Sequence, residues 1–349
     1  MKLLVLCGGE SVERNVSLAS GNSVADWLLQ AGHAVVKYDP EQPGVLFDGA
    51  EHLGGSEIGL TAPEDTLSHG FDTSRIKGLI EAIETVRPDL VYPILHGGYG
   101  EDGTVQSVLE WIKIPYVGSG PLACQIAMNK DMTRRILREL KIPVAEGFAV
   151  PQERALDAVW VATELARTFG YPAVFKPIKG GSTVGLTIVK SADEIKTALE
   201  LIDSIDDLPL IERHFSGREM TATVVEGKCY PLIEIRSKVG FYDYANKYSA
   251  GRVEYVCPVE LPQSFQQEIQ SAAVNAYNAI GCEGCARIDF LVSSSDFICL
   301  EVNTIPGMTA EFGLVPKAAK AYGKTPVKLV QKLVDSAMRR ANMSAAPQE

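Results

Sequence analysis

The sequence lacks a surplus of basic residues. Its 44 aspartates and glutamates outnumber its 33 lysines and arginines, so the formal net charge is −11. Nucleic acids and anionic membranes bind basic surfaces, which argues against either as the main partner. The sequence also has no apolar run near the length of about 18 residues that suggests a membrane-spanning helix. We therefore expect small-molecule partners, no nucleic acid and no membrane.

The sequence lacks a disulfide framework as well. Its seven cysteines are an odd number scattered through 349 residues, whereas disulfide-stapled chains are usually short and have paired cysteines. Cys282 and Cys285 have C-x-x-C spacing, but no second pair completes a zinc site, so we expect buried small residues there. These features favour a reducing compartment, and we expect a cytoplasmic protein.

The order of the apolar segments predicts an α/β protein. The first part of the chain is expected to form a parallel α/β layer, with strands at 3–6, 34–38 and 90–92 and helices at 16–29, 76–86 and 105–111. Residues 44–74 are rich in Gly, Asp, Glu and Ser, and are expected to form a surface excursion. Further helices are predicted at 130–140, 265–280 and 327–338.

The segment from 287 to 309 is the most informative in the chain. Apolar residues alternate over 288–292 and again over 298–300, which predicts two short neighbouring strands. Asp289, Glu301 and Asn303 are then expected to point into one site. Oxygen ligands without His or Cys suit a hard cation such as magnesium, which completes its shell with water and substrate phosphates. The pattern therefore indicates an ATP-type metal site.

A nucleotide site also needs a phosphate cradle, and residues 176–185 supply one. This glycine-rich segment lies between strand-like residues 173–175 and 186–189, so it is predicted to be a hairpin loop. Its backbone N–H groups and the hydroxyls of Ser182 and Thr183 are placed to close over phosphate oxygens.

Two other nucleotide-binding motifs fail on inspection. Residues 323–325 look like the end of a P-loop, but position 318 is Ala318 where that motif requires glycine. Residues 118–123 imitate a dinucleotide fingerprint, but a helical pattern follows through Leu140 instead of a second strand that ends in an acid.

Taken together, these segments resemble the ATP-grasp superfamily and, within it, the D-alanine–D-alanine ligase family. The resemblance covers nearly the whole chain and rests on five segments in the family's order: Gly8–Ser17, His96–Gly103, Lys176–Gly185, Phe241–Tyr248 and Arg287–Thr309. It implies an α/β, three-domain ATP-grasp fold that opens with a parallel-sheet domain. The implied domains are an N-terminal one at 1–118, a central one at 119–213 and a C-terminal one at 214–349. It also implies ATP as co-substrate, two Mg²⁺ ions that Mn²⁺ can replace, and a homodimer.

The resemblance assigns a nucleotide role to several residues. Asp289, Glu301 and Asn303 match the metal ligands, with Glu301 bridging both ions. Three lysines match phosphate contacts and two glutamates match contacts to adenine and ribose: Lys130, Lys176, Lys247, Glu212 and Glu219.

It also assigns residues to the amino-acid substrates. Glu13 matches the acid that receives the first ammonium group, with Ser182 and Tyr248 as its hydrogen-bonded companions, and His96 lies on the same side. Arg287 and the Gly307 N–H match the donors to a tetrahedral oxyanion. Because ester-forming members tend not to keep Tyr at position 248, the expected product is a dipeptide. Residues 241–252, which carry Lys247 and Tyr248 between Gly240 and Gly251, are expected to be a lid.

One departure concerns the second substrate. The family usually continues from Pro-Gly-Met-Thr through two residues to Ser-Leu-Val-Pro, whereas this chain has one extra residue and places Gly313 where the Ser is expected, before Leu314. We expect a bulge that leaves Glu311 in solvent, turns Phe312 inward, and lets backbone N–H groups at Gly313 and Leu314 bind the second carboxylate.

The expected activity is ATP-dependent formation of D-alanyl-D-alanine through an acyl phosphate, for peptidoglycan synthesis. Two alternatives stay open. One is an ATP-grasp ligase for another D-amino acid or amine acceptor, because of the altered 310–313 segment. The other is a catalytically silent, ATP-binding regulatory protein, which the intact Glu13, Lys176 and Arg287 argue against.

Overall fold

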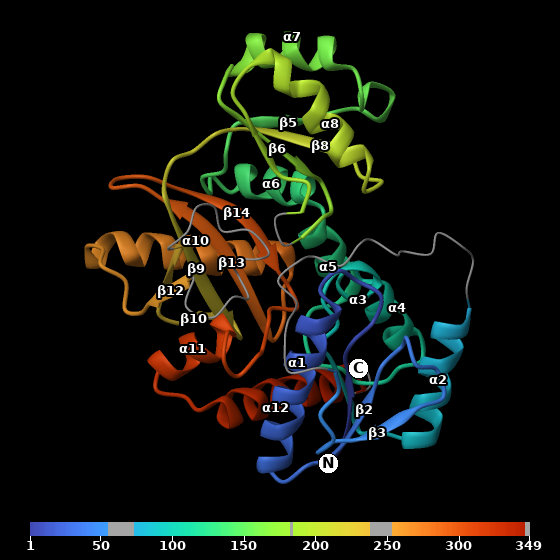
Figure 1. Ribbon diagram of the computed structural model, residues 1–349. Coiled ribbons are helices and arrows are strands. Elements are labelled where there is room, and N and C mark those ends of the chain that lie inside the picture. Colours follow the sequence, from blue (N-terminus) through green and yellow to red (C-terminus); the bar gives the residue numbers. More distant parts are fainter. Residues whose placement is uncertain (55–72, 182–183, 238–252, 346–349) are drawn as a thin grey trace.

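The computed structural model describes residues 1–54, 73–181, 184–237 and 253–345. Helices and three sheets are arranged in three units, each built around one sheet (Figure 1). The unit with β1 to β4 is at the bottom of the view, the large sheet with β9 and β13 is in the middle, and the unit with β5 to β8 is at the top. The expected α/β class is confirmed.

The N-terminal sheet has the strand order β3-β2-β1-β4, with β1 (Lys2–Leu6) parallel to β2 (Ala34–Tyr38) and β4 (Leu90–Pro93). β1 is apolar and buried because a parallel sheet is covered on both faces. The edge strand β3 (Leu46–Asp48) pairs antiparallel with β2, so part of the expected surface excursion belongs to the sheet. The helices are α1 (Arg14–Gln30), α2 (Ser74–Val86), α3 (Gly98–Glu101) and α4 (Thr104–Trp111).

The central sheet has the strand order β5-β8-β6-β7 and all its pairings are antiparallel. β6 and β7 are the two arms of the predicted glycine-rich hairpin, which is thereby confirmed as a hairpin loop. The elements are β5 (Gly147–Ala149), β6 (Ala173–Pro177), β7 (Thr187–Val189), β8 (Pro209–Arg213), α7 (Ala158–Thr168), α8 (Ile195–Asp203) and short 3₁₀ turns at Gln152–Arg154 and Ala192–Glu194.

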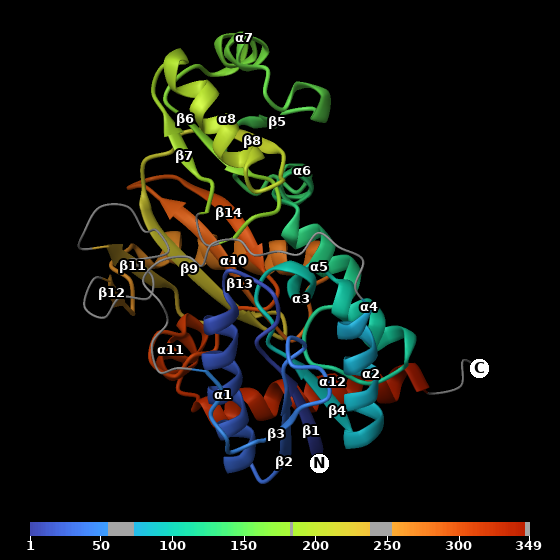
Figure 2. The same cartoon turned by 45° about the vertical axis from the view of Figure 1, so that its right-hand side comes forward.

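The largest sheet has the order β12-β11-β9-β13-β14, with β10 paired to β9. One of its faces packs on α10, which Figure 2 shows behind β9 and β13, and the opposite face looks toward the central unit. Two helices, α5 and α6, connect the N-terminal and central units. The bounds are α5 (Pro121–Met128), α6 (Lys130–Glu139), β9 (Arg218–Val225), β10 (Lys228–Cys229), β11 (Ile233–Ser237), β12 (Val253–Val256), α10 (Gln263–Ile280), β13 (Cys285–Val292) and β14 (Phe297–Asn303).

The chain returns to the N-terminal unit at its end. After α11 (Leu314–Ala321), α12 (Pro326–Ala345) runs beside α1 (Figures 1 and 2), and its length exceeds the predicted 327–338. Apolar residues of α12 share one hydrophobic core with β1, α1 and β4. His33 Nε2 lies 2.8 Å from Gln331 Oε1, and Arg340 donates to the Gly118 carbonyl at 3.0 Å. No helix in the described part of the chain is long and apolar enough to cross a membrane.

Candidate active site

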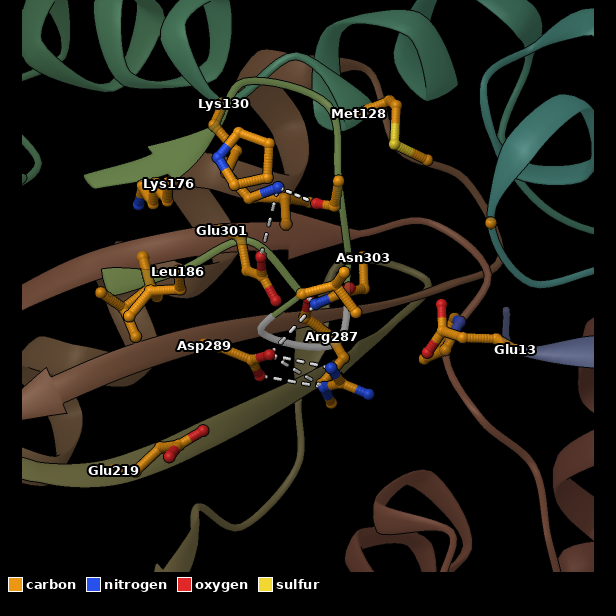
Figure 3. Close-up of a pocket in the computed structure, with 18 of the residues that line it drawn as sticks. Glu13, Met128, Lys130, Lys176, Leu186, Glu219, Arg287, Asp289, Glu301 and Asn303 are labelled. Atoms are coloured by element: carbon orange, nitrogen blue, oxygen red, sulfur yellow. Dashed lines mark hydrogen bonds and ion pairs between the residues drawn. The ribbon is translucent and has the colours of Figure 1, made fainter. Parts of the chain in front are cut away.

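A cavity of about 1280 Å³ is lined by residues of all three units. Its walls come from the loop before α1, the turn after β4, the β6–β7 hairpin, and the strands β9, β13 and β14 with the turns that follow β14. Figure 3 shows the centre of this cavity, where charged side chains from separate elements face one another. Every described residue that the sequence assigned to the site lines this cavity.

The two strands predicted around the acidic residues form as expected. β13 and β14 are antiparallel, with Arg287 opposite Asn303 and Asp289 opposite Glu301. Strand residues two apart point to the same face, so these four side chains share one face of the sheet. Figure 3 shows Asp289, Glu301 and Asn303 around Arg287. The prediction that the three oxygen-bearing residues converge is confirmed.

Asp289 is surrounded by donors. Its carboxylate accepts hydrogen bonds from Thr221 Oγ1 at 2.6 Å, from Arg287 Nη2 at 2.8 Å and Nε at 2.9 Å, and from Asn303 Nδ2 at 3.1 Å. A cation that bound Asp289 would therefore have to share its oxygens with Arg287 or take the place of the guanidinium.

The donor set nevertheless fits magnesium. Among the described residues no group of three or more His, Cys, Asp and Glu side chains is placed to hold a metal ion. Magnesium needs only one or two carboxylates, with water and phosphate oxygens as its other ligands. Asp289 and Glu301 supply two carboxylates on adjacent strands, and Asn303 supplies an amide oxygen beside them. All three line the cavity, where a nucleotide has room to complete the coordination.

Two lysines lie above this sheet. Lys130 is the first residue of α6, whose N-terminus is capped by the side chain of Asn129. Its ammonium lies 4.0 Å from Glu301 Oε2 and also donates to the Gly180 carbonyl. Burial lowers the pKa of Lys130, and the charge of Glu301 opposes that shift.

The second lysine belongs to a buried ion pair. Lys176 Nζ on β6 lies 2.8 Å from Glu212 Oε2 on β8. The two side chains are 8% and 9% exposed, so water screens this contact weakly. Glu219, the other glutamate assigned to the nucleotide, lines the cavity from β9, where it is opposite Leu291. Figure 3 shows it farther along the sheet than Asp289.

The glycine-rich loop is anchored at its first turn. The N–H groups of Lys179 and Gly180 donate to Asp207 Oδ2 at 2.7 and 3.2 Å. Gly180 and Gly181 line the cavity beyond this anchor. Ser182 and Thr183 lie outside the described residues. So do Lys247, Tyr248 and the whole segment assigned to the lid, residues 241–252.

Glu13 lies where two units meet. A Cβ placed on Gly181 would be 3.3 Å from Glu13 Oε2, and one on Gly97 would be 3.6 Å from it. The Glu13 carboxylate is therefore close both to the glycine-rich loop and to the turn after β4. Figure 3 shows it on a separate segment across from Arg287.

A buried ion pair fixes the loop that carries Glu13. Arg14 binds the Asp39 carboxylate through both terminal nitrogens, one at 3.0 Å, and Asp39 also accepts the Gly9 N–H at 3.0 Å. Burial alone would raise the pKa of Asp39, but Arg14 and the N–H groups of Gly9 and Glu41 hold it below its ordinary value. Sequence reasoning missed this pair, because nothing in the sequence indicates that position 39 contacts position 14.

His96 is buried between two units. Its Nδ1 lies 2.9 Å from the Ile305 carbonyl and its Nε2 lies 3.2 Å from Ser20 Oγ. Burial lowers the pKa of His96, so the neutral ring is favoured. The ring lines the cavity, but both of its nitrogens have partners within the protein.

The segment 310–313, where the sequence departs from the family's usual pattern, forms a tight turn that leads into α11. Glu311 is exposed, whereas Phe312, Gly313 and Leu314 line the cavity. The expected orientation of Glu311 and Phe312 is therefore confirmed. The Gly313 N–H, however, donates to the Thr309 carbonyl at 3.0 Å, so this group serves the turn where we expected it to receive a carboxylate.

Sequence reasoning also missed much of the cavity wall. Apolar side chains from the two facing sheets form a slot above the acidic residues: Val174, Leu186, Ile188, Leu291, Ile298 and Leu300. Strand alternation could have found Leu291, because it lies two residues beyond Asp289 on the same strand. Glu101, which lines the cavity near Glu13, was also missed.

The chain is similar to known proteins over nearly its full length. The family described as D-ala D-ala ligase N-terminus matches residues 2–119, and the one described as D-ala D-ala ligase C-terminus matches residues 136–335. A D-alanine–D-alanine ligase of Syntrophotalea carbinolica is 38% identical over 340 residues, which are 97% of each chain. One of Acinetobacter baumannii is 34% identical over 340 residues, 97% of this chain and 96% of that one.

Solved structures give the same result. The Bacillus anthracis D-alanine–D-alanine ligase complexed with ATP matches with a TM-score of 0.77 and 28% identity, over 99% of this chain and 100% of that one. The ligase of Coxiella burnetii matches with a TM-score of 0.78 and 26% identity, over 99% and 95% of the two chains.

Proposed function

Because the chain belongs to the D-alanine–D-alanine ligase family, we propose that it joins two D-alanine molecules to D-alanyl-D-alanine at the expense of ATP. One observation carries the proposal. A single cavity combines the Asp289–Glu301 carboxylate pair, the cations of Lys130 and Lys176, and Glu13 on the facing unit. These are the groups needed to bind a metal–nucleotide complex at one end and an amino acid at the other.

The first half of the reaction activates a carboxylate. The ammonium group of the first D-alanine pairs with Glu13, which directs its carboxylate toward the nucleotide. A carboxylate oxygen forms a bond to the γ-phosphorus of ATP, the bond to the β–γ bridging oxygen breaks, and ADP leaves. This transfer needs charge neutralisation and positioning more than covalent help. Lys130 and Lys176 provide cations for the phosphates, with Lys247 as a third.

Magnesium would be held by Asp289, Glu301 and Asn303, with Glu301 between two ions. When bound, it would neutralise phosphate charge. Glu212 and Glu219 are proposed to contact the adenine region and the ribose, and Ser182 and Thr183 the phosphates. The ion pair between Glu212 and Lys176 supports the assignment of Glu212 to the nucleotide, because Lys176 lies at the start of the glycine-rich loop.

The second half forms the peptide bond. The amine of the second D-alanine, without its extra proton, attacks the acyl phosphate and produces a tetrahedral oxyanion. Arg287 and the Gly307 N–H are proposed to bind this oxyanion. When it collapses, the carbonyl re-forms, phosphate leaves with the electrons of the C–O bond, and the attacking nitrogen gives up one proton, which the phosphate carries away. Ser182 and Tyr248 are proposed to orient Glu13 and the reacting groups, and His96 to support the first substrate. Phe312 and Leu314 form the wall on the second-substrate side.

Several further assignments belong to the same proposal. We assign the product to peptidoglycan synthesis and the protein to the cytoplasm as a homodimer. The domains are proposed at 1–118, 119–213 and 214–349, each containing one of the three sheets.

The test is a screen of amino-acid pairs with ATP, read out by phosphate release and product mass. We expect release that depends on added D-alanine and a product with the mass of the dipeptide. ATP binding without release under any amino-acid pair would instead indicate the silent regulatory protein.

A second candidate function is the ligation of D-alanine to an amine acceptor other than D-alanine. The altered turn at 310–313 is the observation that favours this candidate. Gly313 uses its N–H within the turn, so one expected carboxylate donor is engaged. Kinetics with D-alanine against D-alaninamide as acceptor separate the two. A clear preference for the amide would contradict the dipeptide product while leaving the ATP chemistry in place.

A further inference from the structure

One carboxyl group holds the turn through which two units meet. Glu101 is the last residue of α3, in the turn region after β4, and its Oε2 accepts the Gly97 N–H at 3.1 Å. Gly97 directly follows His96, whose Nδ1 lies 2.9 Å from the carbonyl oxygen of Ile305 in the turn after β14. Glu101 therefore fixes the turn that contacts the large sheet carrying Arg287.

The turn after β14 is held at further points by the same unit. The His96 ring that contacts the Ile305 carbonyl also lies 3.2 Å from Ser20 Oγ on α1 through its Nε2. Ser20 on α1 accepts the Met308 N–H at 3.1 Å. Gly307, the proposed oxyanion donor, lies between these anchored residues and has no side chain of its own to fix it.

Glu101 is also a neighbour of Glu13. Gly97 lies between the two carboxyl groups, because its N–H binds Glu101 while a Cβ on it would lie 3.6 Å from Glu13 Oε2. Glu101 is half-buried and lines the cavity, so its remaining exposure is toward the substrates. The group that holds the Gly97 turn therefore lies beside the group proposed to receive the first ammonium.

We propose that Glu101 is a positioning residue for the ligation, whose carboxyl holds the Gly97 N–H and thereby fixes the turn in which His96 binds the Ile305 carbonyl, so that the Gly307 amide stays in register with Glu13. The inference rests on the proposed function for the roles of Glu13 and Gly307. The connection between the two turns is independent of that function and is tested separately.

The charge of Glu101 gives the proposal a signature. Burial, and then the negative charge of Glu13, raise the pKa of Glu101 to about 7. The ionised form accepts the Gly97 N–H more strongly than the neutral acid does. Binding of an ammonium beside Glu13 favours that ionised form. The charged or titratable groups that interact with Glu101 are Glu13 before α1, Arg287 on β13, Cys124 on α5 and Lys130 on α6, and His96 lies in the turn that Glu101 holds.

The test compares Glu101→Gln and Glu101→Asp with Glu84→Gln, an exposed carboxyl on α2 of the same unit. We expect Glu101→Gln to lower kcat about ten- to a hundredfold, as small misplacements of reacting groups do, with KM for ATP changed less than about twofold. In the wild type and in Glu84→Gln, kcat/KM for D-alanine should rise with pH through about 7. That rise should be lost in Glu101→Gln and kept in Glu101→Asp at a lower kcat.

Hydrogen exchange provides a readout that does not depend on activity. The Gly97 and Gly307 amides should exchange faster in Glu101→Gln than in the wild type and in Glu84→Gln, whatever the amino-acid substrate proves to be. Wild-type kcat with an unchanged pH profile and unchanged exchange would overturn the proposal. So would a loss of ATP affinity in proportion to kcat, since that reports general damage. If Glu101→Gln lacks a cooperative thermal transition, it is not folded and Glu101→Asp becomes the deciding variant. A wild-type kcat in Glu101→Asp would then overturn the proposal. If the wild-type protein forms no dipeptide, the proposed function is contradicted. The connection between the turn after β4 and the turn after β14 is still tested by hydrogen exchange.

Discussion

At the residue scale, the charged groups of the cavity bind one another in this structure. Arg287 forms an ion pair with Asp289, Glu212 forms one with Lys176, and Glu301 lies 4.0 Å from Lys130. Each of these groups is proposed to bind a nucleotide, a metal ion or a developing charge. Ligand binding therefore exchanges one set of charge pairs for another, which keeps buried charges paired in both states.

The first prediction concerns Glu301. Glu301→Gln should lower kcat by roughly a hundredfold or more, because it removes a negative charge from the centre of the proposed metal and phosphate site. Asp296→Asn is the matched control, since Asp296 is an exposed acid in the turn that joins the same two strands. Steady-state rates at several magnesium concentrations provide the measurement. Equal rates in the two variants would remove Glu301 from the metal site.

The second prediction separates stability from function at Lys176 and Glu212. Glu212→Gln leaves a buried ammonium without its partner, so the free energy of unfolding should fall by about 3 kcal/mol. The double variant Lys176→Met/Glu212→Gln should recover most of that loss, because neither charge remains. ATP affinity should stay low in both. Denaturant unfolding and nucleotide titration measure the two quantities, and restored ATP binding in the double variant would show that the pair is only structural.

At the element scale, the start of α11 is set by a close backbone contact. A Cβ on Gly313 would lie 2.3 Å from the Thr309 carbonyl oxygen and 3.0 Å from Pro316 Cδ. The position therefore accepts only glycine without a shift of the turn. The local backbone conformation therefore requires glycine at the position where the family usually has Ser.

The third prediction follows from this contact. Gly313→Ser, which restores the family's hydroxyl, should destabilise the protein by about 2 kcal/mol through overpacking. Gly307→Ala is the control for stability, because a Cβ there has open space within 4 Å. Thermal unfolding of both variants is the measurement. A Gly313→Ser protein as stable as the wild type and more active with D-alanine would mean that the turn adapts easily.

Elements with strong apolar periodicity were predictable from the sequence, and elements defined by pairing or packing were not. The alternation around Asp289 placed β13 and β14 correctly because one face of each strand is buried. β3 was missed because its three residues, Leu46–Asp48, are too few to show a period. The role of Glu101 was missed for a different reason. Its hydrogen-bond partner is the backbone N–H of Gly97, and backbone groups carry no sequence signal.

At the scale of the whole molecule, stability should depend on pH through Glu101. The folded protein keeps this proton up to about pH 7, whereas an unfolded chain releases it near the ordinary Glu value of about 4.3. Unfolding therefore releases a proton between these values, and this group's contribution to stability falls as pH rises across that window.

The fourth prediction is that Glu101→Gln removes this slope. The difference in melting temperature between the variant and the wild type should shift in favour of the variant as pH rises from 5 to 8. The corresponding change in the free energy of unfolding is at most about 3 kcal/mol. Calorimetry at a series of pH values makes the measurement, with Glu84→Gln as control. A constant difference between variant and wild type across this range would show that Glu101 does not titrate there.

The packing of α12 against α1 also constrains how the protein is made. The apolar side of the N-terminal sheet and α1 is covered by Leu329, Val330 and Leu333, which are translated about 200 residues after the N-terminal unit. At ordinary rates of protein synthesis, roughly ten to forty seconds separate the two. During that interval the nascent N-terminal unit exposes the apolar surface that α12 covers in the complete fold. A ribosome-bound chain that stops before Pro326 is therefore a natural client for a chaperone, and a fragment of residues 1–119 alone would be expected to aggregate.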